Sequence, residues 1–204
     1  MDSRFRELLL MYAQADTKTA QDEIEKVLWQ EFGTKKAVLV MDMSGFSRLT
    51  QKYGIVHYLS MVLRMQLTSQ PVIEALGGQV IKFEADNCFA MFDSVLLAVQ
   101  AAVRLNIAFD AINRFTEEAF DIRISIGIDY GDVLLTGGPD FFGDVVNAAS
   151  KLGEDVAGPG EILLTARAFQ ELPPDAGYAG TPITPLLSGV RIEAYHLVYS
   201  QPTS

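Results

Sequence analysis

The first part of the chain carries apolar side chains at helical spacing. They recur every three or four positions through residues 5–12 and again through residues 24–32, and Gly33 ends the pattern. This periodicity predicts an N-terminal helical segment, residues 1–34, that packs on the rest of the chain or on a second copy of it. A regulatory role for the segment is the alternative.

Six segments have the apolar composition of strands. The first, residues 37–41, is an unbroken apolar run that ends at Asp42, which is typical of a strand buried on both faces. Residues 79–83 and 88–92 flank a turn-forming stretch, so they predict a β-hairpin with Asp86 at its tip. The remaining strands are predicted at residues 122–128, 161–164 and 191–199.

Helices are predicted between these strands. Residues 55–76 carry a long apolar face, with a kink expected at Pro71. Asp93 is expected to cap a helix that runs to about residue 118. Shorter helices are predicted at residues 144–152 and 166–171. The order strand, helix, hairpin, helix, strand predicts an α+β fold of the ferredoxin-like βαββαβ type, with C-terminal additions, over residues 35–200.

Composition and charge narrow the class of protein. The chain has 204 residues, of which 49% are hydrophobic, enough for one compact domain with a short appendage. Its formal charge of −10 leaves few cations for a nucleic-acid backbone or an anionic membrane, so we expect neither partner. The single cysteine, Cys88, the lack of an unbroken run of about 18 apolar residues and the lack of a signal peptide predict a cytoplasmic protein.

Two aspartates end neighbouring elements of the predicted sheet. Asp42 follows the first strand and Asp86 lies at the hairpin tip, and the βαββαβ arrangement brings these two points to one rim. Two carboxylates so placed repel each other unless cations neutralise them, so they predict a site for two divalent metal ions, Mg²⁺ or Mn²⁺. Such a pair of ions favours phosphoryl displacement. Each aspartate alone could equally cap a turn.

The turn after Asp42 is a candidate phosphate site. Ser44, Gly45, Phe46 and Ser47 lead from the strand into a helix. A strand that turns at a glycine into a helix exposes backbone N–H groups, which attract phosphate. Most serine–glycine turns hold no ligand, so this turn gains meaning only beside the two aspartates.

Four segments resemble the motifs of class III nucleotidyl cyclases, the catalytic domains of adenylyl and guanylyl cyclases. They occur in the family's order, as VLVMDMSGFS at residues 38–47, GGQVIKFEADNCFAMF at 77–92, FGDVVNAASKL at 142–152 and PGEIL at 159–163. The chain looks most like bacterial soluble adenylyl cyclases. The resemblance implies a cyclase catalytic domain over residues 35–200.

The resemblance implies roles for matched residues. It makes Asp42 and Asp86 the ligands of both metal ions, with the Met43 carbonyl oxygen as a further ligand. Lys82 and Asp140 match the positions at which adenylyl cyclases recognise adenine, which implies ATP as the substrate. The chemistry agrees, because adenine offers an amino donor to a carboxylate and a ring nitrogen to an ammonium, whereas guanine O6 would repel Asp140.

The predicted helix at residues 144–152 carries the remaining matched residues. Asn147 matches the residue that orients the ribose, and Lys151 the residue that stabilises the α-phosphate. The implied reaction is attack of the ATP 3′-hydroxyl on the α-phosphorus, which yields cyclic AMP and pyrophosphate. In this family the metal ligands and the base-recognition residues of one site come from different protomers, so a chain with both sets implies a symmetric homodimer.

The chain departs from the family pattern in two functional positions. Lys151 stands where the family most often has arginine and lacks its planar fork. Leu187 stands where many members carry a triphosphate-binding lysine, which leaves Lys36 or Arg191 to reach the phosphates. These departures keep open a weak or inactive nucleotide-binding regulatory domain, and a cyclase for GTP or a pyrimidine nucleotide is a third alternative.

Two further expectations concern the hairpin turn around Asp86 and the regulation of the chain. Ala85 and Asn87 occupy positions that are usually glycine, and the turn is expected to survive because asparagine tolerates positive φ. No sensor module is recognisable before residue 34, so an unidentified regulatory protein is an expected partner.

Overall fold

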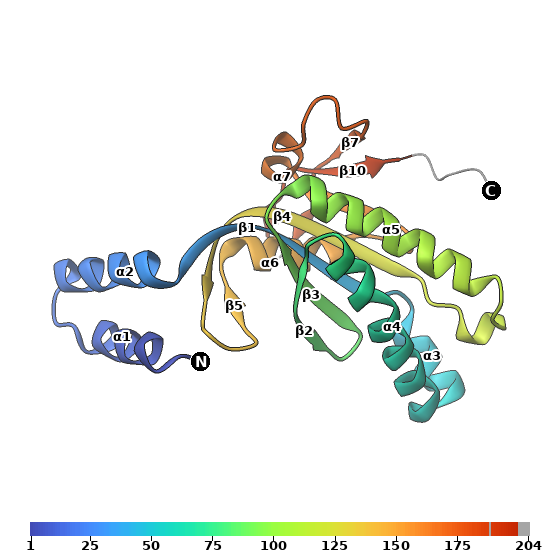
Figure 1. Cartoon of the computed structure of the whole chain (residues 1–204), viewed down its shortest axis with the longest axis horizontal. Helices are drawn as coiled ribbons and strands as arrows, with labels where there is room; N and C mark the ends of the chain where they lie inside the picture. The colour runs from blue at the N-terminus through green and yellow to red at the C-terminus, as the bar shows by residue number, and fades with distance from the viewer. Residues whose placement is uncertain (188, 200–204) are drawn as a thin grey trace.

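A computed structural model describes residues 1–187 and 189–199 (Figure 1), except for the side chains of residues 46–49, 187 and 190. Within this part of the chain, eight strands form one sheet. They are β1 (Gly33–Met43), β2 (Gln79–Glu84), β3 (Asn87–Phe92), β4 (Ile124–Leu135), β5 (Phe141–Phe142), β6 (Ile162–Thr165), β7 (Ala179–Ile183) and β10 (Ala194–Val198). A separate pair consists of β8 (Leu186–Leu187) and β9 (Val190–Arg191).

The strand order across the sheet is β2-β3-β1-β4-β6-β10-β7, with β5 paired to β4. β1 pairs antiparallel with both β3 and β4, and β4 pairs parallel with β6. The four strands β4-β1-β3-β2 have the order of a ferredoxin-like βαββαβ fold. The predicted fold class is therefore confirmed, and β6, β10 and β7 are its C-terminal additions.

Helices cover both faces of this sheet (Figure 1). They are α1 (Ser3–Gln14), α2 (Lys18–Phe32), α3 (Phe46–Tyr53), α4 (Ile55–Ala75), α5 (Val95–Asn113), α6 (Asp144–Ser150) and α7 (Ala166–Gln170), with a 3-10 turn at Glu118–Phe120 and a π-helix, η2, at Lys151–Val156. The larger core lies beneath α4 and α5, where Met65 and Leu105 are fully buried. A smaller core lies beneath α6 around Val145. We call this second side of the sheet the α6 face.

β1 is buried on both faces because its apolar side chains alternate between the two cores. Leu39 and Met41 belong to the core beneath α4 and α5, whereas Val38 and Val40 belong to the core beneath α6. Successive side chains of a strand point to opposite faces. Asp42, two residues after Val40, therefore lies on the α6 face near the end of the strand.

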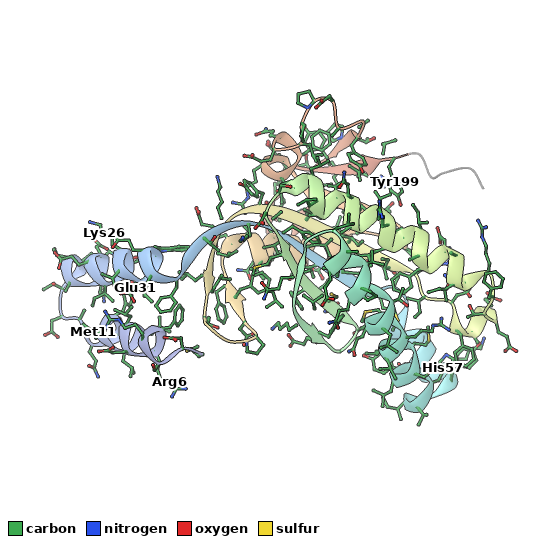
Figure 2. The ribbon with its side chains drawn as sticks, in the orientation of Figure 1. Arg6, Met11, Lys26, Glu31, His57 and Tyr199 are labelled. Carbon is green, nitrogen blue, oxygen red and sulfur yellow. The ribbon has the colours of Figure 1, made fainter. Side chains whose placement is uncertain are left out.

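The N-terminal segment is helical, as predicted, but consists of two helices. The side chain of Thr17 caps α2 and so starts a second helix. The two helices pack through the buried side chains of Phe5, Leu8 and Leu28. Arg4 of α1 also donates at 3.3 Å to Glu31, which is labelled on α2 in Figure 2. The division into residues 1–34 and 35–200 remains a prediction.

The start and the end of α5 differ from the prediction. The prediction that Asp93 caps the helix was wrong. The Ser94 hydroxyl accepts a hydrogen bond from the Leu97 N–H, whereas the Asp93 carboxylate pairs with Lys36. The helix ends at Asn113, whose side-chain amide exchanges two hydrogen bonds of 2.9 Å with the backbone of Ile122. These bonds tie the end of the helix to the residues that lead into β4.

Among the described residues, α5 is the one helix long and apolar enough to cross a membrane by length and composition. Its apolar side packs on the sheet, where Ala98, Val99, Ala102, Leu105 and Phe109 are buried. This burial is typical of the core helix of a folded domain.

The hairpin turn between β2 and β3 forms as predicted, but its residue with positive φ is Ala85 and not Asn87. Ala85 has φ 53, in the left-handed region that disfavours residues with a Cβ. Asn87, which was expected to provide the positive φ, is instead the first residue of β3. The turn that carries Asp86 therefore contains a strained alanine where glycine would fit without cost.

Candidate active site

Two carboxylates meet where β1 ends beside the β2–β3 hairpin. Asp42 lies opposite Asn87 in the sheet register, and Asp86 precedes Asn87 in the turn. Burial, followed by repulsion from Asp86 and Glu154, raises the pKa of Asp42 to about 6. Burial also raises the pKa of Asp86. The structure thus brings together the two aspartates that the sequence pattern put at one rim.

A third carboxylate, that of Glu154, lies near this pair and was missed by the sequence analysis. Burial raises its pKa most, and Asp155, Asp86 and Glu84 raise it further. Glu154 belongs to η2, which continues α6 with the wider turn of a π-helix. A π-helix changes the helical phase, so the 3.6-residue pattern that predicted the helix at residues 144–152 contains no signal for Glu154.

The donor set fits divalent cations that are shared with a phosphate ligand. Mg²⁺ is usually held by one or two carboxylates while substrate phosphates and water fill the other positions. Asp42 and Asp86 supply two carboxylates, and a cation would relieve the repulsion that helps to raise the pKa of Asp42. Within the described residues no group of three His, Cys, Asp or Glu side chains could hold a metal by itself. The pair therefore suits ions that bind together with a substrate.

A β-bulge turns Lys82 onto the α6 face. The register of β2 against β3 shifts between Val80 and Lys82, so Lys82 lies opposite Phe89 rather than Cys88. Phe89 packs beneath α6, whereas Cys88 is buried beneath α4 and α5. Because a shift of one residue exchanges the two faces of a strand, a regular β2 would direct Lys82 into the apolar core.

The Lys82 ammonium joins the hairpin to the segment before β5. Its Nζ lies 3.1 Å from Asp140 Oδ1 and 2.8 Å from Glu84 Oε2, and 5.1 Å from the centre of the Phe89 ring. The hydrogen bond to Glu84, and then that to Asp140, raises the pKa of Lys82. The structure therefore pairs the two residues expected to recognise adenine, and it adds Glu84, which sequence reasoning missed.

The helix α6 presents Asn147 to solvent, and Lys151 follows at the start of η2. The π-helix approaches the sheet closely at Gly153, where an added Cβ would lie 2.8 Å from the Val40 carbonyl oxygen and 2.9 Å from the Gly127 nitrogen. Within the described residues, no hydrogen bond or ion pair links Asn147 or Lys151 to the aspartate pair or to Lys82. One protomer therefore does not bring the two sets of predicted residues into contact.

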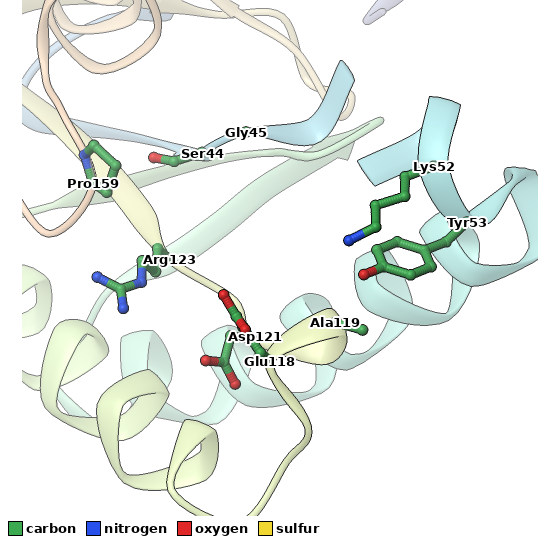
Figure 3. A pocket seen from close by; sticks show the side chains of 9 residues that line it. All are labelled: Ser44, Gly45, Lys52, Tyr53, Glu118, Ala119, Asp121, Arg123 and Pro159. Carbon is green, nitrogen blue, oxygen red and sulfur yellow. The ribbon is translucent and has the colours of Figure 1, made fainter. Parts of the chain in front are cut away.

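The turn after β1 borders a pocket of about 510 Å³ (Figure 3). The Ser44 N–H donates to the Arg123 carbonyl oxygen at 2.8 Å, which fixes the turn to the residues before β4. Gly45, with φ 84, precedes the first turn of α3. The pocket is also lined by two cations, Lys52 and Arg123, and by two anions, Glu118 and Asp121. The backbone predicted to bind phosphate thus faces an open space with cationic side chains.

Three of the predicted site residues have side chains that the structure does not describe. The side chains of Phe46, Ser47 and Leu187 are outside the described part of the structure. Lys36, one candidate to replace the missing cation, pairs with Asp93. It lies six residues before Asp42 on an extended strand, about 20 Å away. Within one protomer, Lys36 is therefore too far from the aspartate pair to contact a phosphate held there.

Comparison of the sequence with known proteins finds relatives that are named adenylate cyclases. No family model matches the chain. It is 30% identical over 129 residues to a protein of Rhizobium meliloti named putative adenylate cyclase 3, an alignment that covers 63% of this chain and 22% of the relative. It is 28% identical over 135 residues to an adenylate cyclase of Streptomyces coelicolor, covering 66% and 33%. The chain thus spans between about a fifth and a third of the length of these relatives.

The fold has a solved counterpart of similar size. A crystal structure of an adenylate/guanylate cyclase/hydrolase from Silicibacter pomeroyi superposes with a TM-score of 0.67 at 27% sequence identity. The superposition covers 83% of this chain and 99% of the other. The sheet topology, the order of the four motifs and these likenesses agree, and the chain belongs to the class III adenylate/guanylate cyclase family as a nucleotidyl cyclase domain.

Proposed function

We propose that this chain is an adenylyl cyclase that converts ATP to 3′,5′-cyclic AMP and pyrophosphate at a homodimer interface. The ion pair between Lys82, on the hairpin that also carries Asp86, and Asp140, just before β5, is the observation that supports this proposal most. It combines an ammonium donor and a carboxylate acceptor, which complement the N1 and N6 positions of adenine. The names of the Rhizobium and Streptomyces relatives agree with this substrate.

Asp42 and Asp86, with the Met43 carbonyl oxygen, would hold two divalent ions, Mg²⁺ or Mn²⁺. When bound, such ions neutralise phosphate charge and make the 3′-hydroxyl more acidic. The chain's own contribution is the close approach of the two carboxylates, which the sheet register of β1 against β3 imposes. This arrangement presents a compact anionic site to ions that the triphosphate brings with it.

The remaining residues hold the nucleotide in place. Lys82 donates to N1 of adenine and Asp140 accepts from the N6 amino group. Asn147 orients the ribose, and Lys151 neutralises charge on the α-phosphate. The 3′-oxygen forms a bond to the α-phosphorus, the bond from that phosphorus to the bridging oxygen breaks, pyrophosphate leaves and the hydroxyl proton passes to solvent.

The pocket beside Ser44 and Gly45 is the proposed position of the outer phosphates. Backbone N–H groups at the start of α3 attract anions, and Arg123 and Lys52, which line the pocket together with Glu118 and Asp121, are the cations available to a phosphate there. These two cations would compensate for the absence of lysine at Leu187. The phosphate-binding role that Phe46 and Ser47 were predicted to share then rests on their backbone N–H groups.

A second copy of the chain completes each site in this proposal. The absence of described contacts between Asn147 or Lys151 and the aspartate pair supports this arrangement. In a symmetric dimer, Asn147 and Lys151 of one protomer would face the metal-binding carboxylates of its partner. A single protomer would then be inactive.

The deciding experiment incubates the purified chain with ATP, GTP, CTP or UTP and either Mn²⁺ or Mg²⁺, and separates the products. Cyclic AMP formed from ATP, and lost in Asp42→Ala and Asp86→Ala variants, is the expected result. Asp175→Ala, at an exposed residue far from the hairpin in sequence, is the matched control. If no nucleotide yields a cyclic product, the proposed function is wrong, and nucleotide binding without turnover would favour the regulatory alternative.

A further inference from the structure

We propose that Glu84 is a third base-recognition residue, which makes the site reject cytosine. The proposal rests on the proposed nucleotide-cyclising function. It concerns a row of three charged groups in which the Lys82 ammonium lies between the carboxylates of Glu84 and Asp140.

The bulge in β2 places Glu84 beside Lys82. Lys82 lies opposite Phe89 and Glu84 opposite Asn87, so both follow the bulge and, two residues apart, point to the same side of the sheet. Their side chains remain accessible, with 31% of Lys82, 65% of Glu84 and 49% of Asp140 exposed. A ligand on the α6 face can therefore contact all three groups.

The contacts of Lys82 leave one donor for a ligand. An ammonium group has three N–H donors. One bonds to Glu84 and one to Asp140, while Nζ lies over the Phe89 ring, 5.1 Å from its centre, where there is no hydrogen-bonding oxygen or nitrogen. The third donor is therefore directed away from both carboxylates, and each carboxylate keeps lone pairs for a ligand. The row therefore presents an acceptor at Asp140, a donor at Lys82 and a second acceptor at Glu84.

This order matches the polar edge of adenine. The N6 amino group of adenine donates, N1 accepts, and the C2–H is a weak donor. Guanine presents O6, N1–H and an amino group, so it would oppose acceptor to acceptor at Asp140 and donor to donor at Lys82. Uracil opposes like groups at all three positions. Both bases are therefore rejected by the Lys82–Asp140 pair even without Glu84.

Cytosine is the base that the Lys82–Asp140 pair cannot reject. Its N4 amino group donates and its N3 accepts, as N6 and N1 of adenine do. The two bases differ at the next position, where adenine has C2–H and cytosine has the O2 acceptor. Glu84 supplies an acceptor there, so cytosine would face an unpaired, repelling carboxylate, which is an effective way to exclude a competitor.

The test compares CTP with ATP in the wild-type chain and in Glu84→Gln. Glutamine can turn its amide to offer an N–H to cytosine O2, so the ratio of kcat/KM for CTP to that for ATP should rise about tenfold. Glu25→Gln, an exposed glutamate on α2, should leave the ratio at the wild-type value. Glu84→Leu removes the carboxylate without adding a donor, and a smaller rise is expected. It also serves if Glu84→Gln fails to fold.

A binding measurement separates this proposal from the proposed function. The 3′-deoxy forms of ATP and CTP lack the attacking hydroxyl, so their affinities report base recognition without turnover. If the wild-type chain forms no cyclic product but Glu84→Gln binds 3′-deoxy-CTP about tenfold better relative to 3′-deoxy-ATP, the role of Glu84 is supported and the cyclase function is not. If the wild-type chain cyclises ATP and neither folded Glu84 variant changes either ratio, the role of Glu84 is refuted.

Discussion

The carboxylate of Asp42, near the end of β1, lies beside that of Asp86 at the tip of the β2–β3 hairpin. Burial and the neighbouring acids raise the pKa of Asp42 from its ordinary value of 3.8 to about 6. The folded chain therefore binds this proton more tightly than the unfolded chain does. It follows that the contribution of this carboxyl group to the free energy of unfolding falls as the pH rises between about 4 and about 6. The group therefore makes the metal-free protein less stable at neutral pH than at pH 4.

Replacement of Asp42 by asparagine should therefore stabilise the metal-free protein at pH 7.5. Because the site is partly open to solvent, the gain is expected to be roughly 1 kcal/mol, or about 2–4 °C in Tm. At pH 4 the folded wild-type carboxyl is already protonated, so the gain should nearly vanish. Thermal unfolding at both pH values checks this, with Asp175→Asn as the control, and an equal gain at both values would contradict it. Mn²⁺ added together with 3′-deoxy-ATP should stabilise the wild-type chain more than it stabilises Asp42→Asn.

Lys82 and Asp140 should act as one unit in adenine recognition. Lys82→Met and Asp140→Asn are each expected to lower kcat/KM for ATP by about 10- to 100-fold, because each removes one of the two groups that complement adenine and breaks the ion pair that positions the other. The double variant should be little worse than the poorer single variant. A double-mutant cycle measures this coupling, and strictly additive effects would show that the two residues act independently.

Two inactive variants should restore activity when they are mixed. Asp42→Ala lacks a metal ligand and Asn147→Ala lacks the ribose contact, so a heterodimer keeps one intact site. At equal mixing, half of the dimers are heterodimers with one of two sites working, so about a quarter of the wild-type activity is expected. Mass spectrometry of isotope-labelled subunits confirms exchange. Exchange without recovered activity would count against sites shared between protomers.

Lys151 should limit turnover because an ammonium is a point charge, whereas arginine contacts two phosphate oxygens at once. Lys151→Arg is therefore expected to raise kcat about three- to tenfold, and Lys151→Gln to lower it by a larger factor. Steady-state kinetics with ATP distinguishes the two. A similar fall in both variants would mean that Lys151 has another role.

The ion pair beneath α6 between the buried Asp129 and the half-exposed Arg167 should be a sensitive point of the fold. Asp129 has no solvent exposure, and it accepts a hydrogen bond of 2.7 Å from Arg167 Nε and further bonds from Arg167 Nη2 and Thr165. Arg167→Ala leaves this carboxylate without its cation and should lower the free energy of unfolding by about 2–4 kcal/mol. Urea denaturation measures the loss. The double variant Asp129→Leu/Arg167→Leu removes the unpaired charge as well, so it should be more stable than Arg167→Ala. If it is not, the loss in Arg167→Ala does not come from an unpaired Asp129 carboxylate.

Much of the arrangement was predictable because it depends on local patterns. The apolar run before Asp42 and the turn around Asp86 identify two strand ends, and the βαββαβ order makes those ends neighbours. The cap of α5 was not predictable in the same way. Asp93 and Ser94 both suit a helix start, and the choice depends on Lys36 of β1, which pairs with Asp93. A contact between distant segments decided between two equally good local signals.

The sequence by itself determined the order of the elements, the pairing of Asp42 with Asp86 and the motifs of the family. These follow from hydrophobic periodicity and residue order, which are properties of the chain. Only the tertiary structure decided that Lys82 and Glu84 lie on the α6 face rather than on the opposite face of the sheet, since the bulge in β2 depends on how that strand fits β3. It also brought Asp140 to Lys82 and Glu154 to the aspartates, because long-range packing and the wide turn of η2 leave no periodic trace in the sequence.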